Sequence, residues 1–127
     1  MTDEAKKILV VDDEQVTTEL AKTFLEKNDF VVVTAGDGEE ALRLAEQERP
    51  DLIMLDVMLP TIDGFEVCRR LRSDKSFESV PILIFTARGF SSDLEKGQEV
   101  GADEYILKPF SNRALVATIR RHLGIGK

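Results

Sequence analysis

Five short apolar runs, separated by stretches with helical spacing of apolar residues, constrain the fold of this chain most strongly. Each run is continuous rather than alternating, which is typical of strands whose two faces are both covered. The stretches between them have apolar residues three or four positions apart, which predicts one helix after each strand. The runs are residues 8–11, 30–33, 52–55, 82–85 and 105–107, and the helical sets include Val16, Leu20 and Phe24, then Ala41, Leu42 and Ala45, then Phe65, Cys68 and Leu71.

Five strand–helix units in succession predict a single α/β domain over residues 1–127. Parallel neighbours need crossover connections, and these are right-handed, so we expect helices on both faces of one parallel five-stranded sheet. A doubly wound sheet with the strand order 2-1-3-4-5 has a flavodoxin-like topology and binds its ligands at the carboxyl edge of the strands. We therefore expect the functional residues at that edge.

Capping signals predict where the helices begin and end. A helix start is predicted where an acceptor side chain precedes Glu by three residues, as in the pairs Asp37/Glu40, Asp63/Glu66 and Ser92/Glu95. Ser111 precedes the last helix, and Gly101 predicts the end of the fourth.

Charge and cysteine content narrow the classes of function. The chain has 24 acidic and 17 basic side chains and a formal net charge of −7, so this domain alone would repel nucleic acid and anionic lipid. We find no signal-like or membrane-spanning apolar segment and expect a cytoplasmic location. Cys68 is the only cysteine, which excludes an internal disulfide and favours a small core residue.

Polar side chains follow four of the five predicted strands. The second strand ends without a reactive group, and if the strand order is 2-1-3-4-5, this strand lies at the edge of the sheet. The four strands with polar ends are then contiguous, so their side chains would face one crevice. These residues are Asp12 and Asp13 after the first strand, Asp56 after the third, Thr86 after the fourth and Lys108 after the fifth.

Three carboxylates in one crevice need compensating positive charge, because two of them 4 Å apart repel by about 4 kcal/mol at an effective dielectric near 20. Lys108 supplies one positive charge. A divalent cation, Mg²⁺ or Mn²⁺, would supply the rest, because such ions prefer oxygen ligands, and Asp12 and Asp13 would bind it. With a hydroxyl from Thr86, these are the parts of a phosphoryl-transfer site. Asp56 is the candidate nucleophile, since carboxylates form aspartyl phosphates.

At these positions the chain resembles the receiver domain of two-component response regulators, and chemotaxis regulators in particular. The matching segments are ILVVDDE, DLIMLDVMLPTIDG, ILIFTA and GADEYILKPF, and they cover essentially the whole chain in order. The resemblance implies a signalling switch that catalyses its own phosphorylation and dephosphorylation, rather than an enzyme. Asp56 would accept a phosphoryl group from a phosphohistidine on a histidine kinase or a His phosphotransfer protein.

The same resemblance implies the metal ligands and the switch residues. Mg²⁺ would be bound by Asp13, Asp56 and the backbone carbonyl of Met58, with Asp12 acting mostly through water. Thr86 and Tyr105 match the switch pair, in which the hydroxyl moves toward the phosphoryl group and the aromatic ring turns inward.

Three further positions carry expectations from the family. The peptide between Lys108 and Pro109 is cis in the family, a state found in only about 5–6% of X–Pro bonds in folded proteins. Met58 and Arg88 match positions at which the phosphoryl lifetime is tuned. An apolar Met58 cannot orient an attacking water, which predicts a moderate to long lifetime.

The expected output surface comprises the helix over residues 91–101, the strand over 105–107 and the last helix. It would contact a downstream protein or a fused output domain, and a phosphorylation-dependent dimer through it is one expected assembly. Because the sequence ends at the last receiver helix, we expect no output domain within it. A stand-alone protein and an excised part of a longer regulator both remain open, as do the cognate kinase and the target.

Other interpretations of these residues are weaker. Asp13 alone could cap the first helix, and Lys108 alone could be a surface cation. For Arg120, Arg121 and His122 in the last helical turn, a role in nucleic-acid contact or as a phosphohistidine is weaker than the favoured one, in which these cations offset the helix dipole. An Asp-nucleophile phosphatase would have an acid two residues after the nucleophile, where this chain has Met58. A flavin-binding flavodoxin relative would need a phosphate-cradling loop after the first strand, where residues 12–15 are DDEQ.

Overall fold

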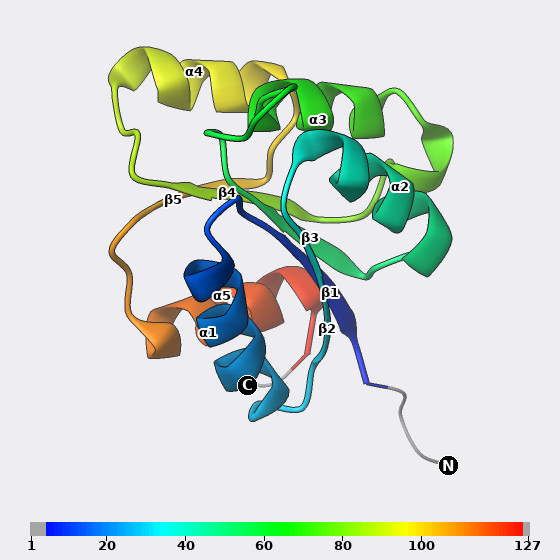
Figure 1. Cartoon of the computed structure of the whole chain (residues 1–127), viewed down its shortest axis with the longest axis vertical. Coiled ribbons are helices and arrows are strands. Elements are labelled where there is room, and N and C mark those ends of the chain that lie inside the picture. Colours follow the sequence, from blue (N-terminus) through cyan, green and yellow to red (C-terminus); the bar gives the residue numbers. More distant parts are fainter. Residues whose placement is uncertain (1–4, 126–127) are drawn as a thin grey trace.

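The five predicted strands form one sheet. The computed structural model describes residues 5–125, and all four strand pairings in the sheet are parallel. The order is β2-β1-β3-β4-β5, so the predicted doubly wound, flavodoxin-like fold is confirmed (Figure 1). The strands are β1 (Lys7–Val11), β2 (Val31–Ala35), β3 (Leu52–Leu55), β4 (Ile82–Thr86) and β5 (Glu104–Leu107).

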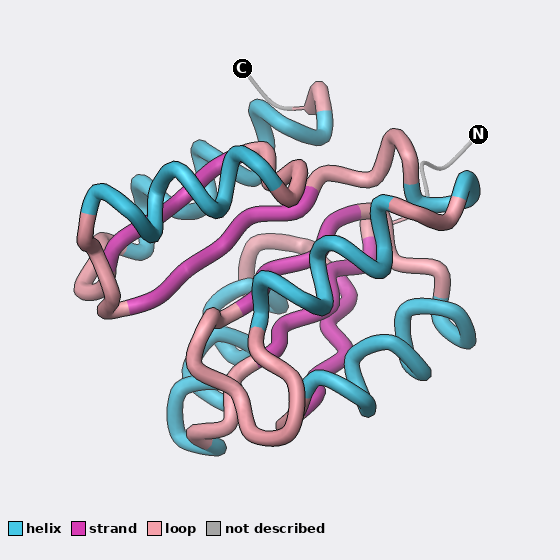
Figure 2. Tube along the Cα trace, turned by 90° about the horizontal axis from the view of Figure 1, so that it is seen from above, coloured by secondary structure: helices cyan, strands magenta, loops and turns pink. Residues whose placement is uncertain are grey.

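Helices cover both faces of this sheet, as Figures 1 and 2 show. Helices α1 and α5 lie on one face, and α2, α3 and α4 lie on the other. None of the helices within residues 5–125 is both long and apolar enough to cross a bilayer. The helices are α1 (Gln15–Glu26), α2 (Gly38–Glu48), α3 (Gly64–Arg72), α4 (Ser91–Glu99) and α5 (Asn112–Leu123), with a short 3₁₀ helix, η1 (Lys75–Phe77), after α3.

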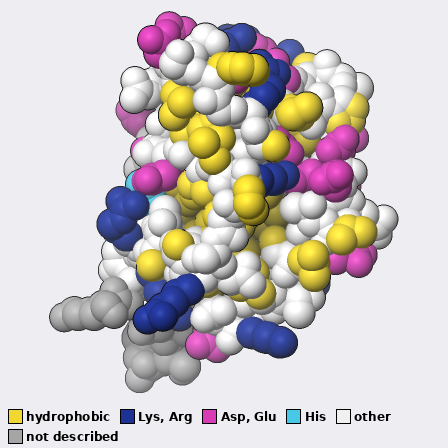
Figure 3. All heavy atoms as spheres, turned by 90° about the vertical axis from the view of Figure 1, so that its left-hand side faces the viewer, with side chains coloured by type: hydrophobic (Ala, Val, Ile, Leu, Met, Phe, Trp, Pro, Cys, Tyr) yellow, Lys and Arg dark blue, Asp and Glu magenta, His cyan; other side chains and the backbone are white. Residues whose placement is uncertain are grey.

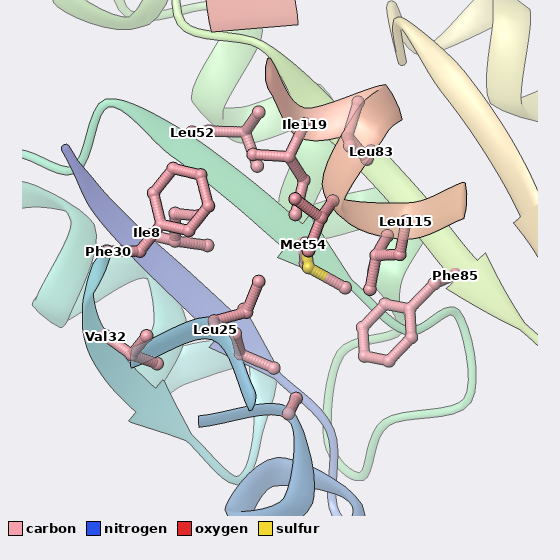
Figure 4. Packing of buried hydrophobic residues seen from close by; sticks show 13 residues of the cluster. Ile8, Leu25, Phe30, Val32, Leu52, Met54, Leu83, Phe85, Leu115 and Ile119 are labelled. Carbon is pink, nitrogen blue, oxygen red and sulfur yellow. The ribbon is translucent and has the colours of Figure 1, made fainter. Parts of the chain in front are cut away.

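The continuous apolar runs are explained by two cores, one on each face. Side chains alternate along a strand, so Ile8 and Val10 of β1 pack into the core under α1 and α5, whereas its other apolar residues pack under α2 and α3. Figure 4 shows the first core, in which Leu115 and Ile119 of α5 approach Met54 of β3. The central strand β3, buried on both faces, is therefore apolar throughout.

The predicted helix starts are confirmed for three helices and wrong for one. The side chains of Asp37, Asp63 and Ser111 accept backbone N–H groups in the first turns of α2, α3 and α5, at 2.7–2.9 Å. Helix α4 starts at Ser91 rather than after Ser92, and the carboxylate of Asp93 accepts the N–H of Phe90. A carboxylate inside the first turn thus replaces the expected serine cap.

Helix α1 forms where predicted but buries a different face. Val16 and Leu20 are 71% and 67% exposed, and the buried residues are Thr18, Ala21 and Leu25. The Thr18 hydroxyl donates to the Gln15 carbonyl at 2.9 Å, which satisfies its polar atom inside the protein. Periodicity alone therefore identified the helix but not its inward side.

Arg72, at the end of α3, joins three segments at the amino edge of the sheet. Its side chain is only 18% exposed. The Asp103 carboxylate that it binds also accepts the N–H of Ile82, the first residue of β4. The Arg72 guanidinium donates to the carbonyls of Phe77, Val80 and Gly101 and to the Asp103 carboxylate, at 2.6–2.9 Å.

We expect Arg72→Ala to lower the free energy of unfolding by about 2–4 kcal/mol, because bonds from a charged donor contribute about 1.5–3 kcal/mol each and the carbonyls lose their partner. Urea unfolding would measure the loss. Arg70→Ala is the matched control on the same helix, since Arg70 is 48% exposed and its ion pair with Glu66 is a surface pair, which contributes less than about 1 kcal/mol. Equal losses in the two variants would contradict the role of Arg72.

Candidate functional site

The carboxyl edge of the sheet brings together four of the five predicted polar residues. Asp12 and Asp56 directly follow β1 and β3, and Thr86 is the last residue of β4. All three are buried, with exposed fractions of 1%, 5% and 0%. Lys108 directly follows β5 and reaches back across the edge.

The Lys108 ammonium bridges two carboxylates that lie far apart in sequence. Its Nζ atom is 2.6 Å from Oδ2 of Asp12 and 3.1 Å from Oδ2 of Asp56. It also lies 4.8 Å from the centroid of the Phe85 ring, within the range of a cation–π contact. One cation therefore holds the ends of β1, β3 and β5 together.

Burial and pairing act in opposite directions on these charges. Burial raises the pKa of Asp12, and the hydrogen bond from Lys108 offsets part of that rise. Burial alone would lower the pKa of Lys108, but its hydrogen bonds and attraction to Asp12 and Asp56 outweigh burial and raise it. Lys108 is therefore a fixed positive charge at neutral pH.

Backbone donors hold the remaining carboxylate oxygens. Oδ1 of Asp12 accepts the N–H of Glu14 at 2.9 Å, and Oδ1 of Asp56 accepts the N–H of Met58 at 3.1 Å. The Asp56 N–H in turn donates to the Val11 carbonyl at 3.0 Å. These bonds fix where both carboxylates point.

The fifth predicted residue, Asp13, comes directly after Asp12 at the same edge of the sheet. It is exposed, and it does not cap α1, whose N-cap is Glu14 without a side-chain cap. Within residues 5–125, no three Asp, Glu, His or Cys side chains are gathered closely enough to form a ready-made metal site.

The chemistry of the edge nevertheless suits a hard divalent cation. Its candidate donors are all oxygen atoms, from Asp12, Asp13, Asp56 and the Met58 carbonyl. Three carboxylates bring three negative charges and Lys108 neutralises one of them, so a divalent cation would balance the remainder. The donor types and the charge therefore fit Mg²⁺.

Both members of the predicted switch pair contact the backbone of Arg88. The Thr86 hydroxyl accepts the Arg88 N–H at 3.4 Å, and the Tyr105 hydroxyl donates to the Arg88 carbonyl at 2.6 Å. The Lys108–Pro109 peptide, which follows β5, is cis. Met58 is 54% exposed beside Asp56.

Two residues at this edge were missed by sequence reasoning. Gly64 packs against the backbone of Asp56 so closely that a Cβ atom would lie 2.1 Å from the Asp56 carbonyl oxygen. Asp93 is 4% exposed and binds the Arg88 guanidinium at 2.8 Å. Gly64 stands in a quoted motif, but nothing in the sequence distinguished Asp93 from other acids in α4.

Comparison with known proteins identifies the family of this chain. The family model described as "Response regulator receiver domain" matches residues 8–120. The alkaline phosphatase synthesis transcriptional regulatory protein PhoP of Bacillus subtilis is 52% identical over 115 residues, which are 91% of this chain and 47% of the relative. A probable transcriptional regulator, ycf27, of Guillardia theta is 47% identical, with 91% and 44% covered. The chain thus spans about half the length of these relatives.

Solved structures show the same fold. The chemotaxis response regulator CheY4 of Vibrio cholerae has a TM-score of 0.87 at 33% identity, covering 93% of this chain and 98% of that one. The BeF3-activated N-terminal receiver domain of RstA from Klebsiella pneumoniae has a TM-score of 0.86 at 36% identity, covering 92% and 97%. The chain therefore belongs to the response regulator receiver domain family.

Proposed function

We propose that this receiver accepts a phosphoryl group on Asp56 from a phosphohistidine of a sensor histidine kinase or a His phosphotransfer protein. The observation that carries the proposal is the Lys108 ammonium, which lies within hydrogen-bond distance of both Asp12 and Asp56. A cation beside the attacking carboxylate can stabilise the charge that develops on the transferred group. Phosphorylation of this kind makes the domain a switch rather than an enzyme with a separate substrate.

The transfer is an in-line displacement at phosphorus. A carboxylate oxygen of Asp56 forms a bond to phosphorus, the bond from phosphorus to the donor imidazole nitrogen breaks, and the electron pair leaves with that nitrogen. Lys108 pairs with one phosphoryl oxygen and the Thr86 hydroxyl donates to another. Asp12, Asp13, Asp56 and the Met58 carbonyl are the residues that would hold Mg²⁺ or Mn²⁺, which neutralises phosphoryl charge when bound.

The output of the switch is proposed to pass through the surface formed by α4, β5 and α5. Phe90, Leu94 and Leu107, at or near this surface, are 72%, 38% and 45% exposed. Figure 3 views the side of the molecule that is on the left in Figure 1, where apolar side chains lie among acidic and basic ones. Such a mixed surface suits reversible docking of a protein, including a second copy of this chain.

The half-length match to transcriptional regulators suggests what is controlled. PhoP and ycf27 are named as transcriptional regulators, so we propose a DNA-binding output, fused or separate. The net charge of −7 makes DNA contact by this domain itself unfavourable. A cytoplasmic location is part of the same proposal.

Intact mass after treatment with acetyl phosphate and Mg²⁺ tests the acceptor. We expect the wild type to gain the mass of one phosphoryl group and Asp56→Asn to gain none, because an amide cannot attack phosphorus. Asp29→Asn is the matched control, an exposed residue at positive φ that asparagine tolerates equally well, and it should be labelled like the wild type. Equal labelling of Asp56→Asn and the wild type would overturn the assignment.

The phosphoryl lifetime tests the role of Met58. In Met58→Asn or Met58→Glu a polar group beside Asp56 can orient an attacking water, so we expect hydrolysis to be about tenfold faster, equivalent to about 1.4 kcal/mol. Decay of the phosphorylated mass after removal of the donor measures the rate. Met58→Leu keeps the apolar character and should decay at the wild-type rate; an unchanged rate in the polar variants would contradict the proposal.

A further inference from the structure

In the segment from Thr86 to Asp93, one residue, Arg88, contacts Thr86, Asp93 and Tyr105. Its backbone N–H donates a hydrogen bond to the Thr86 hydroxyl, and its backbone carbonyl accepts one from the Tyr105 hydroxyl. Its guanidinium bonds to both carboxylate oxygens of Asp93, at 2.8 Å and 3.4 Å. Any displacement of Arg88 therefore moves a contact of Thr86 and a contact of Tyr105 together.

Asp93 is the anchor of this arrangement. Its side chain is 6% exposed, whereas that of Arg88 is 46% exposed. The carboxylate also accepts the N–H of Phe90 at 3.3 Å, which ties it to the start of α4. The hydrogen bond from Arg88 lowers the pKa of Asp93, so the anchor is ionised at neutral pH.

Tyr105 also contacts helix α4 itself. Gly97 of α4 faces its ring, and a Cβ atom there would lie 3.0 Å from Cδ2 of Tyr105. The ring therefore rests on α4 while the hydroxyl binds the loop before α4. One support of Tyr105 is the Arg88 carbonyl and the other is α4, and the ion pair of Arg88 with Asp93 joins the loop that carries the first to the helix that provides the second.

We propose that Asp93 is a positioning residue that, through its ion pair with Arg88, sets the place of Tyr105. In this arrangement the Arg88 side chain holds the carbonyl that the Tyr105 hydroxyl binds. Losing either charge releases that carbonyl, and Tyr105 changes its surroundings. The use of this coupling in signalling rests on the function proposed above, whereas the dependence of Tyr105 on Asp93 does not.

The composition of the chain provides the probe. Tyr105 is the only tyrosine, and there is no tryptophan, so carbon-13 labelling of tyrosine gives one set of ring signals. We would compare unphosphorylated wild type, Asp93→Asn, Arg88→Gln and the control Glu95→Gln. Glu95 is exposed on the same helix, so its substitution removes a nearby negative charge without breaking the ion pair.

The two test variants change the charge in opposite directions. If the ion pair positions Tyr105, the ring signals of Asp93→Asn and Arg88→Gln shift the same way, and Glu95→Gln leaves them at the wild-type position. Raising the salt from 0.1 M to 1 M, which shortens the Debye length from about 10 Å to 3 Å, should shift the wild type in that direction and the two variants much less. Opposite shifts would mean a direct effect of charge on the ring, and unchanged signals in Asp93→Asn would mean no coupling; either result overturns the proposal.

Phosphorylation separates this inference from the proposed function. With acetyl phosphate and Mg²⁺, Asp93→Asn should gain one phosphoryl mass like the wild type, because Asp93 lies outside the acceptor group, but phosphorylation should move its Tyr105 signals less. A wild type that gains no mass would refute the proposed function and leave the shifts of the unphosphorylated variants as a complete test of the coupling. An equal Tyr105 response to phosphorylation in both proteins would refute the coupling alone.

Discussion

The contact of Lys108 with Asp12 and Asp56 is the interaction on which the carboxyl edge depends. Two buried carboxylates would repel each other and resist leaving water, and the ammonium between them offsets both costs. Because the three residues follow three different strands, the same contact links the ends of β1, β3 and β5. A phosphoryl donor would meet a carboxylate whose direction is already fixed by Lys108 and by the Met58 N–H.

Two arginines illustrate how differently the two edges of the sheet are held. At the amino edge, Arg72 is 18% exposed and has four acceptors, which join α3, the segment after it and the turn before β5. At the carboxyl edge, Arg88 is 46% exposed and its guanidinium pairs with Asp93 alone among the described residues. A switch needs one rigid end and one that can rearrange, and this distribution of bonds provides both.

The packing on both faces explains why the fold could be predicted in such detail. Strands buried on two sides favour apolar residues, so their runs stand out, and the polar residues lie at the strand ends or just past them. Placing Asp12, Asp56, Thr86 and Lys108 at one edge then required only the rule that parallel strands end together. The weaker alternative, Asp13 as a helix cap, is not observed, because the N-cap of α1 is the next residue, Glu14.

The sequence by itself determined the strands, the succession of helices and the polar residues that follow the strands, because these depend on local patterns. The sheet order was an expectation from the doubly wound topology, and the structure confirms it. Tertiary structure alone decided which face of α1 is buried, that Asp93 pairs with Arg88, that Arg72 binds three carbonyls, and that Gly64 must lack a side chain beside Asp56. These features depend on distances between segments that packing sets. The spacing of apolar residues predicts that a segment is a helix, but it does not predict which other segments will pack against that helix.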